Sequence, residues 1–109
     1  MSASVNDRNK AIEEAKVASG ASKITDSLNQ ISNLLSTFPE DIELLHSRAM
    51  LFEKKQEWAK AINDYLKILS LDNSDKKART QTEMLKTILR YNNTDIYSSP
   101  NTHYDPWFE

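Results

Sequence analysis

Apolar side chains recur every three or four residues along most of the chain, which is the spacing of an amphipathic α-helix. The pattern predicts five helices, over residues 8–19, 25–37, 40–54, 57–71 and 75–90. Pro39 separates the second helix from the third, and short polar side chains over residues 72–75 favour a turn before the last helix. The expected fold is therefore all-α, built from antiparallel helical hairpins.

Each predicted helix gathers its apolar residues in one row, and we expect these rows to face one another in a core. The rows contain Ala11, Ile12, Ala15 and Ala18; Leu28, Ile31, Leu34 and Leu35, flanked by Ile24 and Phe38; Ile42, Leu45, Ala49 and Phe52; Trp58, Ala61, Ile62, Tyr65, Ile68 and Leu69; and Ala78, Met84, Leu85, Ile88 and Leu89. Small residues such as Ala49 and Ala61 allow neighbouring helices to approach closely, while aromatic side chains fill the space beside them.

Composition narrows the classes of fold and function. The 109 residues include one glycine and no cysteine. Scarce glycine disfavours a sandwich or barrel with many tight turns, and the lack of cysteine excludes disulfides, a thiol nucleophile and a thiolate metal site. Fourteen basic and sixteen acidic residues give a net charge of −2, which favours neither nucleic-acid nor membrane-surface binding. With no pattern of a signal peptide or a membrane span, we expect a cytoplasmic protein.

The chain aligns with itself, without a gap, when it is shifted by thirty-four residues. Ala15 then meets Ala49, and Asp41 meets Asp75. The period and the residue types together resemble the tetratricopeptide repeat, a helix–turn–helix unit of about that length. In the better copy, Leu45, Ala49, Phe52, Ala61 and Tyr65 stand where the family places its large, small and aromatic residues.

The resemblance implies a small two-repeat protein of bacterial type. Its repeats would cover residues 8–41 and 42–75, followed by a capping helix at 76–90. Residues 1–7 are then expected to form a flexible N-terminal segment, and residues 91–109 an aromatic tail. An unrelated five-helix bundle is the alternative fold.

The chain also departs from the family pattern. Arg48 replaces the usual leucine, and Asn73 replaces the terminal proline. Neither turn within a hairpin has the family's glycine, because Ser22 and Gln56 stand there. Gly20 lies two residues before the first of these positions and indicates an early or irregular end to the first helix.

In tetratricopeptide proteins, the first helices of successive repeats line a concave groove that takes extended or helical peptides. Carried over to this chain, the resemblance implies a groove formed by Ile12, Lys16, His46, Ser47, Met50, Lys77, Gln81 and Met84. The carboxylate clamp of the family's chaperone-binding members is expected to be absent, since His46 and Met50 occupy its positions. The alternative is that these residues are simply exposed.

Little in the sequence favours catalysis or a cofactor. Glu43 and His46 have the Glu-x-x-His spacing of di-iron bundles, but the second such pair that a di-iron site needs is absent. His46 is instead expected to be a solvated groove residue. Gly20 alone does not make a phosphate-binding loop, and the basic run that begins at Lys76 suits a solvated capping helix. We therefore expect no enzyme, no cofactor and no metal site.

The aromatic tail holds five of the nine aromatic residues, whereas disordered tails are usually poor in them. Its candidate docking residues are Tyr104, Trp107 and Phe108. The tail is disordered, folds back over its own last helix or groove, or docks into another molecule. The favoured function is non-catalytic protein–protein interaction, with an unidentified peptide or protein segment bound in the groove. The alternative is a structural, self-assembling protein, including a homodimer formed through the groove or the tail.

Overall fold

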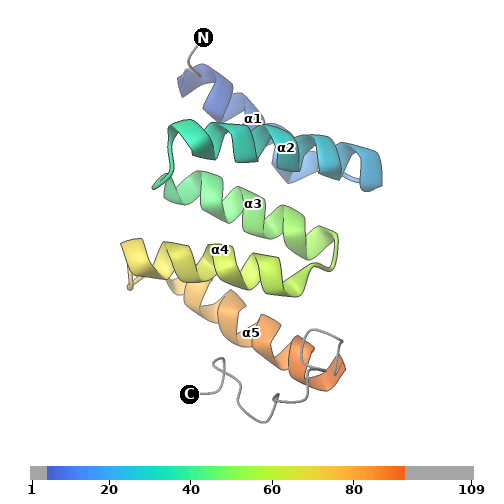
Figure 1. The fold of residues 1–109 in the computed structure, drawn as a ribbon, viewed down its shortest axis with the longest axis vertical. Coiled ribbons are helices and arrows are strands. Elements are labelled where there is room, and N and C mark those ends of the chain that lie inside the picture. The colour runs from blue at the N-terminus through green and yellow to red at the C-terminus, as the bar shows by residue number, and fades with distance from the viewer. Residues whose placement is uncertain (1–4, 93–109) are drawn as a thin grey trace.

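The computed structural model describes residues 5–92 and places them in five α-helices. These are α1 (Val5–Val17), α2 (Ala21–Thr37), α3 (Ile42–Lys54), α4 (Trp58–Leu71) and α5 (Lys76–Asn92). No strand occurs between residues 5 and 92. Successive connections lie at opposite ends of the stack, so each helix runs against the one before it (Figure 1). The expectation of an all-α chain is confirmed for the described residues.

Helix α3 is the most enclosed of the five. Each helix packs against the next, and α3 also packs against α1. As a consequence α3 buries a second row, which includes Leu44 and Leu51, both with no exposed surface. The prediction of a single apolar row is therefore wrong for α3, because that pattern assumes that a helix packs on one side only.

The thirty-four-residue period recurs in the bounds of the helices. Helix α5 begins 34 residues after α3, and α4 ends 34 residues after α2. Asp41 precedes α3 and accepts a hydrogen bond from the backbone nitrogen of Leu44 at 3.2 Å. Asp75 precedes α5 and accepts one from the backbone nitrogen of Ala78 at 2.9 Å. Equivalent side chains therefore begin equivalent helices, since each satisfies a nitrogen that lacks a partner within its helix.

The first hairpin departs from this period at both ends of α1. The helix begins at Val5, so residues 5–7 are helical and only residues 1–4 of the expected flexible segment lie outside the described part. This first turn is polar, with Asp7 placed favourably near the positive end of the dipole, and an apolar pattern does not detect it. At the other end, Gly20 has a φ of 86°, and α2 begins directly after it at Ala21. The predicted start at residue 25 is wrong because the chain reverses earlier.

Lys54 closes the C-terminal end of α1. Its ammonium group donates to the carbonyl oxygens of Ala15, Lys16 and Ala18, at 3.3, 3.3 and 2.8 Å. The last carbonyls of a helix have no partner within the helix and form the negative end of its dipole, so a lysine there is doubly favourable. The contact fixes α1 against α3, the two helices that carry most of the predicted groove.

Gln56 turns the chain between α3 and α4 with a φ of 60°, at a position where the family resemblance places a glycine. A left-handed conformation costs a residue with a side chain about 1–2 kcal/mol, and the greater backbone entropy of glycine offsets part of this. We therefore expect Gln56→Gly to raise the free energy of unfolding by about 0.5–1 kcal/mol, measured by urea denaturation.

Gln30 provides the matched control, because it is exposed and helical within α2. There the same substitution is expected to lower the free energy of unfolding by about 1 kcal/mol. Equal losses at Gln30 and Gln56 would contradict the left-handed turn.

Candidate functional site

A shallow hollow lies between α1, α3 and α5 and has a volume of about 120 Å³. Its lining residues are Ile12 and Lys16 of α1; Glu43, His46, Ser47 and Met50 of α3; and Lys77 of α5. We call this hollow the α1–α3–α5 groove. Six of the eight residues predicted for a groove line it, because the repeat brings the corresponding faces of α1, α3 and α5 to the same side.

Gln81 and Met84, the other two predicted groove residues, do not line the hollow. The amide nitrogen of Gln81 instead donates to both carboxylate oxygens of Glu53, at 3.1 and 3.2 Å. The same carboxylate accepts a 2.5 Å hydrogen bond from the hydroxyl of Tyr65. Gln81 therefore ties α5 to α3, while Met84 lies outside the groove with 42% of its surface exposed.

The groove has an apolar floor. Ile12 is 6% exposed and Met50 is half-buried. Ser47 is only 7% exposed, so its hydroxyl is largely covered rather than offered to a ligand as expected. The floor therefore favours an apolar side chain from a partner over a hydrogen-bonding group.

His46 is not the solvated residue that the sequence suggested. Its Nε2 lies 2.9 Å from Oδ2 of Asp75, and only 19% of its side chain is exposed. The imidazole meets the ring of Tyr65 edge-on, with 5.8 Å between the ring centroids. His46 therefore links α3 to the residue that caps α5, and the sequence gave no local signal for this pair because its members are 29 positions apart.

Charge in the groove comes mainly from two lysines. Lys16 and Lys77 are exposed, and within residues 5–92 Lys77 has no ion pair. The carboxylate of Glu43 is 2.5 Å from Nη2 of Arg8, which offsets its negative charge. The groove thus presents two ammonium groups beside an apolar floor.

Two capping carboxylates give the chain a predicted acid sensitivity. The Arg8 guanidinium holds the pKa of Asp41 below its usual range, and His46 does the same for the pKa of Asp75. Both groups release protons more readily in the folded chain, so their contribution is present above about pH 4 and is lost as the pH falls through the folded pKa values. We expect urea denaturation to show this loss between about pH 4 and pH 2.

Asparagine keeps a capping oxygen but removes the charge. The Asp41→Asn/Asp75→Asn variant is therefore expected to lose about 1 kcal/mol per site near pH 7 and to change less than the parent chain on acidification. Asp26→Asn, at an exposed position of α2, controls for the removal of a carboxylate elsewhere. Parallel pH curves for the parent and the double variant would contradict the assignment.

Sequence reasoning missed a buried ion pair on another face of α3. Arg48 donates from Nε to Oδ2 of Asp64 at 2.9 Å and from Nη2 to Oδ1 at 2.8 Å. Asp64 is 5% exposed, and its burial raises its pKa while the hydrogen bonds from Arg48 lower it. The only signal was Arg48 itself, a cation at a position where the family has leucine. The pair borders an open hollow of about 440 Å³ between α2, α3 and α4.

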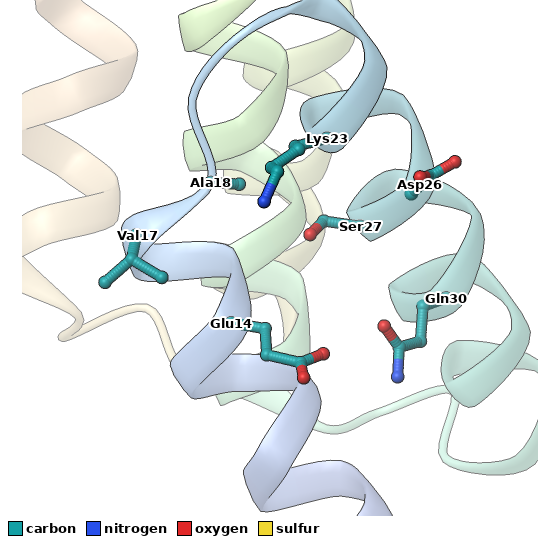
Figure 2. Close-up of a pocket in the computed structure, with 7 residues that line it drawn as sticks. All are labelled: Glu14, Val17, Ala18, Lys23, Asp26, Ser27 and Gln30. Atoms are coloured by element: carbon teal, nitrogen blue, oxygen red, sulfur yellow. The ribbon is translucent and has the colours of Figure 1, made fainter.

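A third hollow, of about 330 Å³, lies where α1 turns into α2. Figure 2 shows Glu14, Val17 and Ala18 on one side, with Lys23, Asp26, Ser27 and Gln30 on the other. The lining mixes both signs of charge, and Asp26 points away from the centre of the hollow. This hollow therefore has no set of like groups directed at one ligand.

The described helices include none long and apolar enough to cross a membrane. Within residues 5–92, no group of three or more histidine, aspartate or glutamate side chains is placed to hold a metal ion. The predicted docking residues Tyr104, Trp107 and Phe108 lie outside the described residues. Comparison of the chain with protein-family models, curated proteins and solved structures gave no match.

Proposed function

We propose that this chain is a non-catalytic interaction module of the tetratricopeptide type, which binds a peptide or protein segment in the α1–α3–α5 groove. The observation that carries the proposal is the apolar floor formed by Ile12 and Met50, with the ammonium groups of Lys16 and Lys77 beside it. Concave apolar sites with a few polar groups at fixed places are typical binding sites.

The repeat supports the tetratricopeptide part of the proposal. Helix bounds recur after 34 residues, and the side chains that begin α3 and α5 are both aspartates. Ala15 and Ala49, which occupy equivalent positions, are both fully buried where α1 packs against α3. Together these features suit two stacked hairpins followed by a helix that closes the array.

The size and chemistry of the groove support peptide binding over catalysis. Its volume of about 120 Å³ is below the roughly 300–1,000 Å³ of small-molecule sites, but it accommodates part of one large side chain. Its histidine is already bonded to Asp75. Burial, reinforced by Glu53, raises the pKa of the nearby Tyr65, which favours its neutral form. The chain's lack of cysteine suits a module that acts in the cytoplasm.

Selection of peptides tests this proposal. A random peptide library displayed on phage is panned against the full chain, and the enriched peptides are synthesised and titrated by fluorescence anisotropy. We expect Met50→Glu to weaken their binding by roughly tenfold or more, because it places a carboxylate on the apolar floor.

Val17→Glu provides the control, since it places the same acid at an exposed apolar position outside the groove. It is expected to leave binding unchanged, and circular dichroism checks that both variants are folded. Equal binding to all three proteins, or no enriched peptide, would overturn the proposal.

A further inference from the structure

The groove selects for a particular kind of segment. Glu43 is paired with Arg8, so the unbalanced charges that line the groove are the ammonium groups of Lys16 and Lys77. The floor between the helices is formed by Ile12 and Met50. The complementary ligand is therefore a large apolar side chain with carboxylates close to it in sequence.

The chain itself contains such a segment. Residues 93–109 include three acidic residues and neither lysine nor arginine. Within them, Trp107 and Phe108 stand between Asp105 and Glu109. An aromatic pair flanked by carboxylates matches an apolar floor beside two ammonium groups.

The distances along the chain permit this segment to reach the groove. Lys77 lines the groove at the start of α5, and the helix ends at Asn92. Fifteen helical residues span about 22 Å, whereas fifteen extended residues from Asn92 to Trp107 reach up to about 50 Å. The connection is therefore long enough to return along α5 with length to spare.

We propose that the C-terminal segment of the chain, through Trp107 and Phe108, occupies its own α1–α3–α5 groove and competes there with peptide partners. The inference rests on the proposed function, because it names an occupant of the same site. Covalent attachment presents the segment at a local concentration on the order of 1 mM, so an intrinsic dissociation constant of about 0.1 mM suffices for the groove to be mostly filled.

Methionine methyl groups report the occupancy in the full chain. Met50 lines the groove, whereas Met84 is exposed on α5 outside it and serves as an internal reference. In the chain labelled with ¹³C at the methionine methyl groups, the rings of Trp107 and Phe108 are expected to shift the Met50 methyl signal. The Trp107→Ser/Phe108→Ser variant is expected to lose that shift and to leave the Met84 signal in place.

Charge variants test the lysines separately. Lys16→Glu/Lys77→Glu is expected to move the Met50 signal to its position in the Trp107→Ser/Phe108→Ser variant, with little further change when all four substitutions are combined. Lys23→Glu/Lys67→Glu reverses two exposed lysines that do not line the groove and is expected to have no effect. A Met50 signal that ignores the serine substitutions would overturn the inference, as would a shift that fades on dilution, which would assign the groove to a second copy.

Peptides selected on the chain separate this inference from the proposed function. They are expected to bind Trp107→Ser/Phe108→Ser about tenfold more tightly than the parent chain, because the attached competitor is removed. Equal affinities together with an unshifted Met50 signal would remove the inference and keep the peptide-binding groove. If no peptide binds either protein, the proposed function fails, and the Met50 signal still decides whether the segment occupies the groove.

Discussion

Arg48→Leu is expected to lower the free energy of unfolding by about 3–5 kcal/mol near pH 7, even though leucine is the residue that the repeat family has there. The carboxylate of Asp64 is 5% exposed and receives two hydrogen bonds from Arg48. Removal of the guanidinium leaves a buried charge without its partner, and no apolar gain at position 48 compensates for that. Urea denaturation followed by circular dichroism measures the loss.

The double variant Arg48→Leu/Asp64→Leu is the matched control. Replacement of a whole buried ion pair by apolar residues is often neutral, whereas removal of one partner is costly. We therefore expect the double variant to recover most of the stability lost by Arg48→Leu. A double variant that loses the sum of two large single effects would show instead that leucine does not fit at one of these positions.

The pH dependence of Arg48→Leu has a definite sign. Burial raises the pKa of Asp64, and loss of the hydrogen bonds from Arg48 is expected to raise it further. A carboxyl group whose pKa is raised on folding destabilises the folded state when the pH is above the unfolded value. The deficit of Arg48→Leu is therefore expected to shrink as the pH falls from about 7 towards 4, and a deficit that grows over this range would contradict the assignment.

The pair also illustrates where sequence reasoning stops. Arg48 was identified as a departure from the family pattern, but Asp64 lies 16 positions away on the next helix. No local spacing rule connects two such positions, because their contact depends on how α3 and α4 are rotated against each other. The same limit applies to His46 and Asp75, whose pairing depends on where α5 begins.

Features governed by periodicity were predicted more fully. Apolar spacing gave the five helices, and the thirty-four-residue shift brought Ile12, Met50 and Lys77 to one groove. Helix ends were less predictable, since they depend on backbone conformations such as the positive φ of Gly20. The pattern also does not report how many neighbours a helix has, which decides how many of its faces are buried.

Leu51 tests that last point, because it lies outside the apolar row predicted for α3 and yet has no exposed surface. Contacts of α3 with α1, α2 and α4 leave no face of the helix on which this side chain meets water. Leu51→Ala is therefore expected to lower the free energy of unfolding by about 2–5 kcal/mol, the cost of a cavity in a close-packed core. Thermal and urea denaturation both measure it.

Leu66 is the matched control, because it also lies outside the predicted rows but is 37% exposed on α4. The same substitution there removes less buried surface and permits water to fill the space, so Leu66→Ala is expected to cost about 1 kcal/mol. If the single rows were the whole core, the two substitutions would have similar small effects. A larger loss at Leu66 than at Leu51 would contradict the central position of α3, from which the walls of the α1–α3–α5 groove follow.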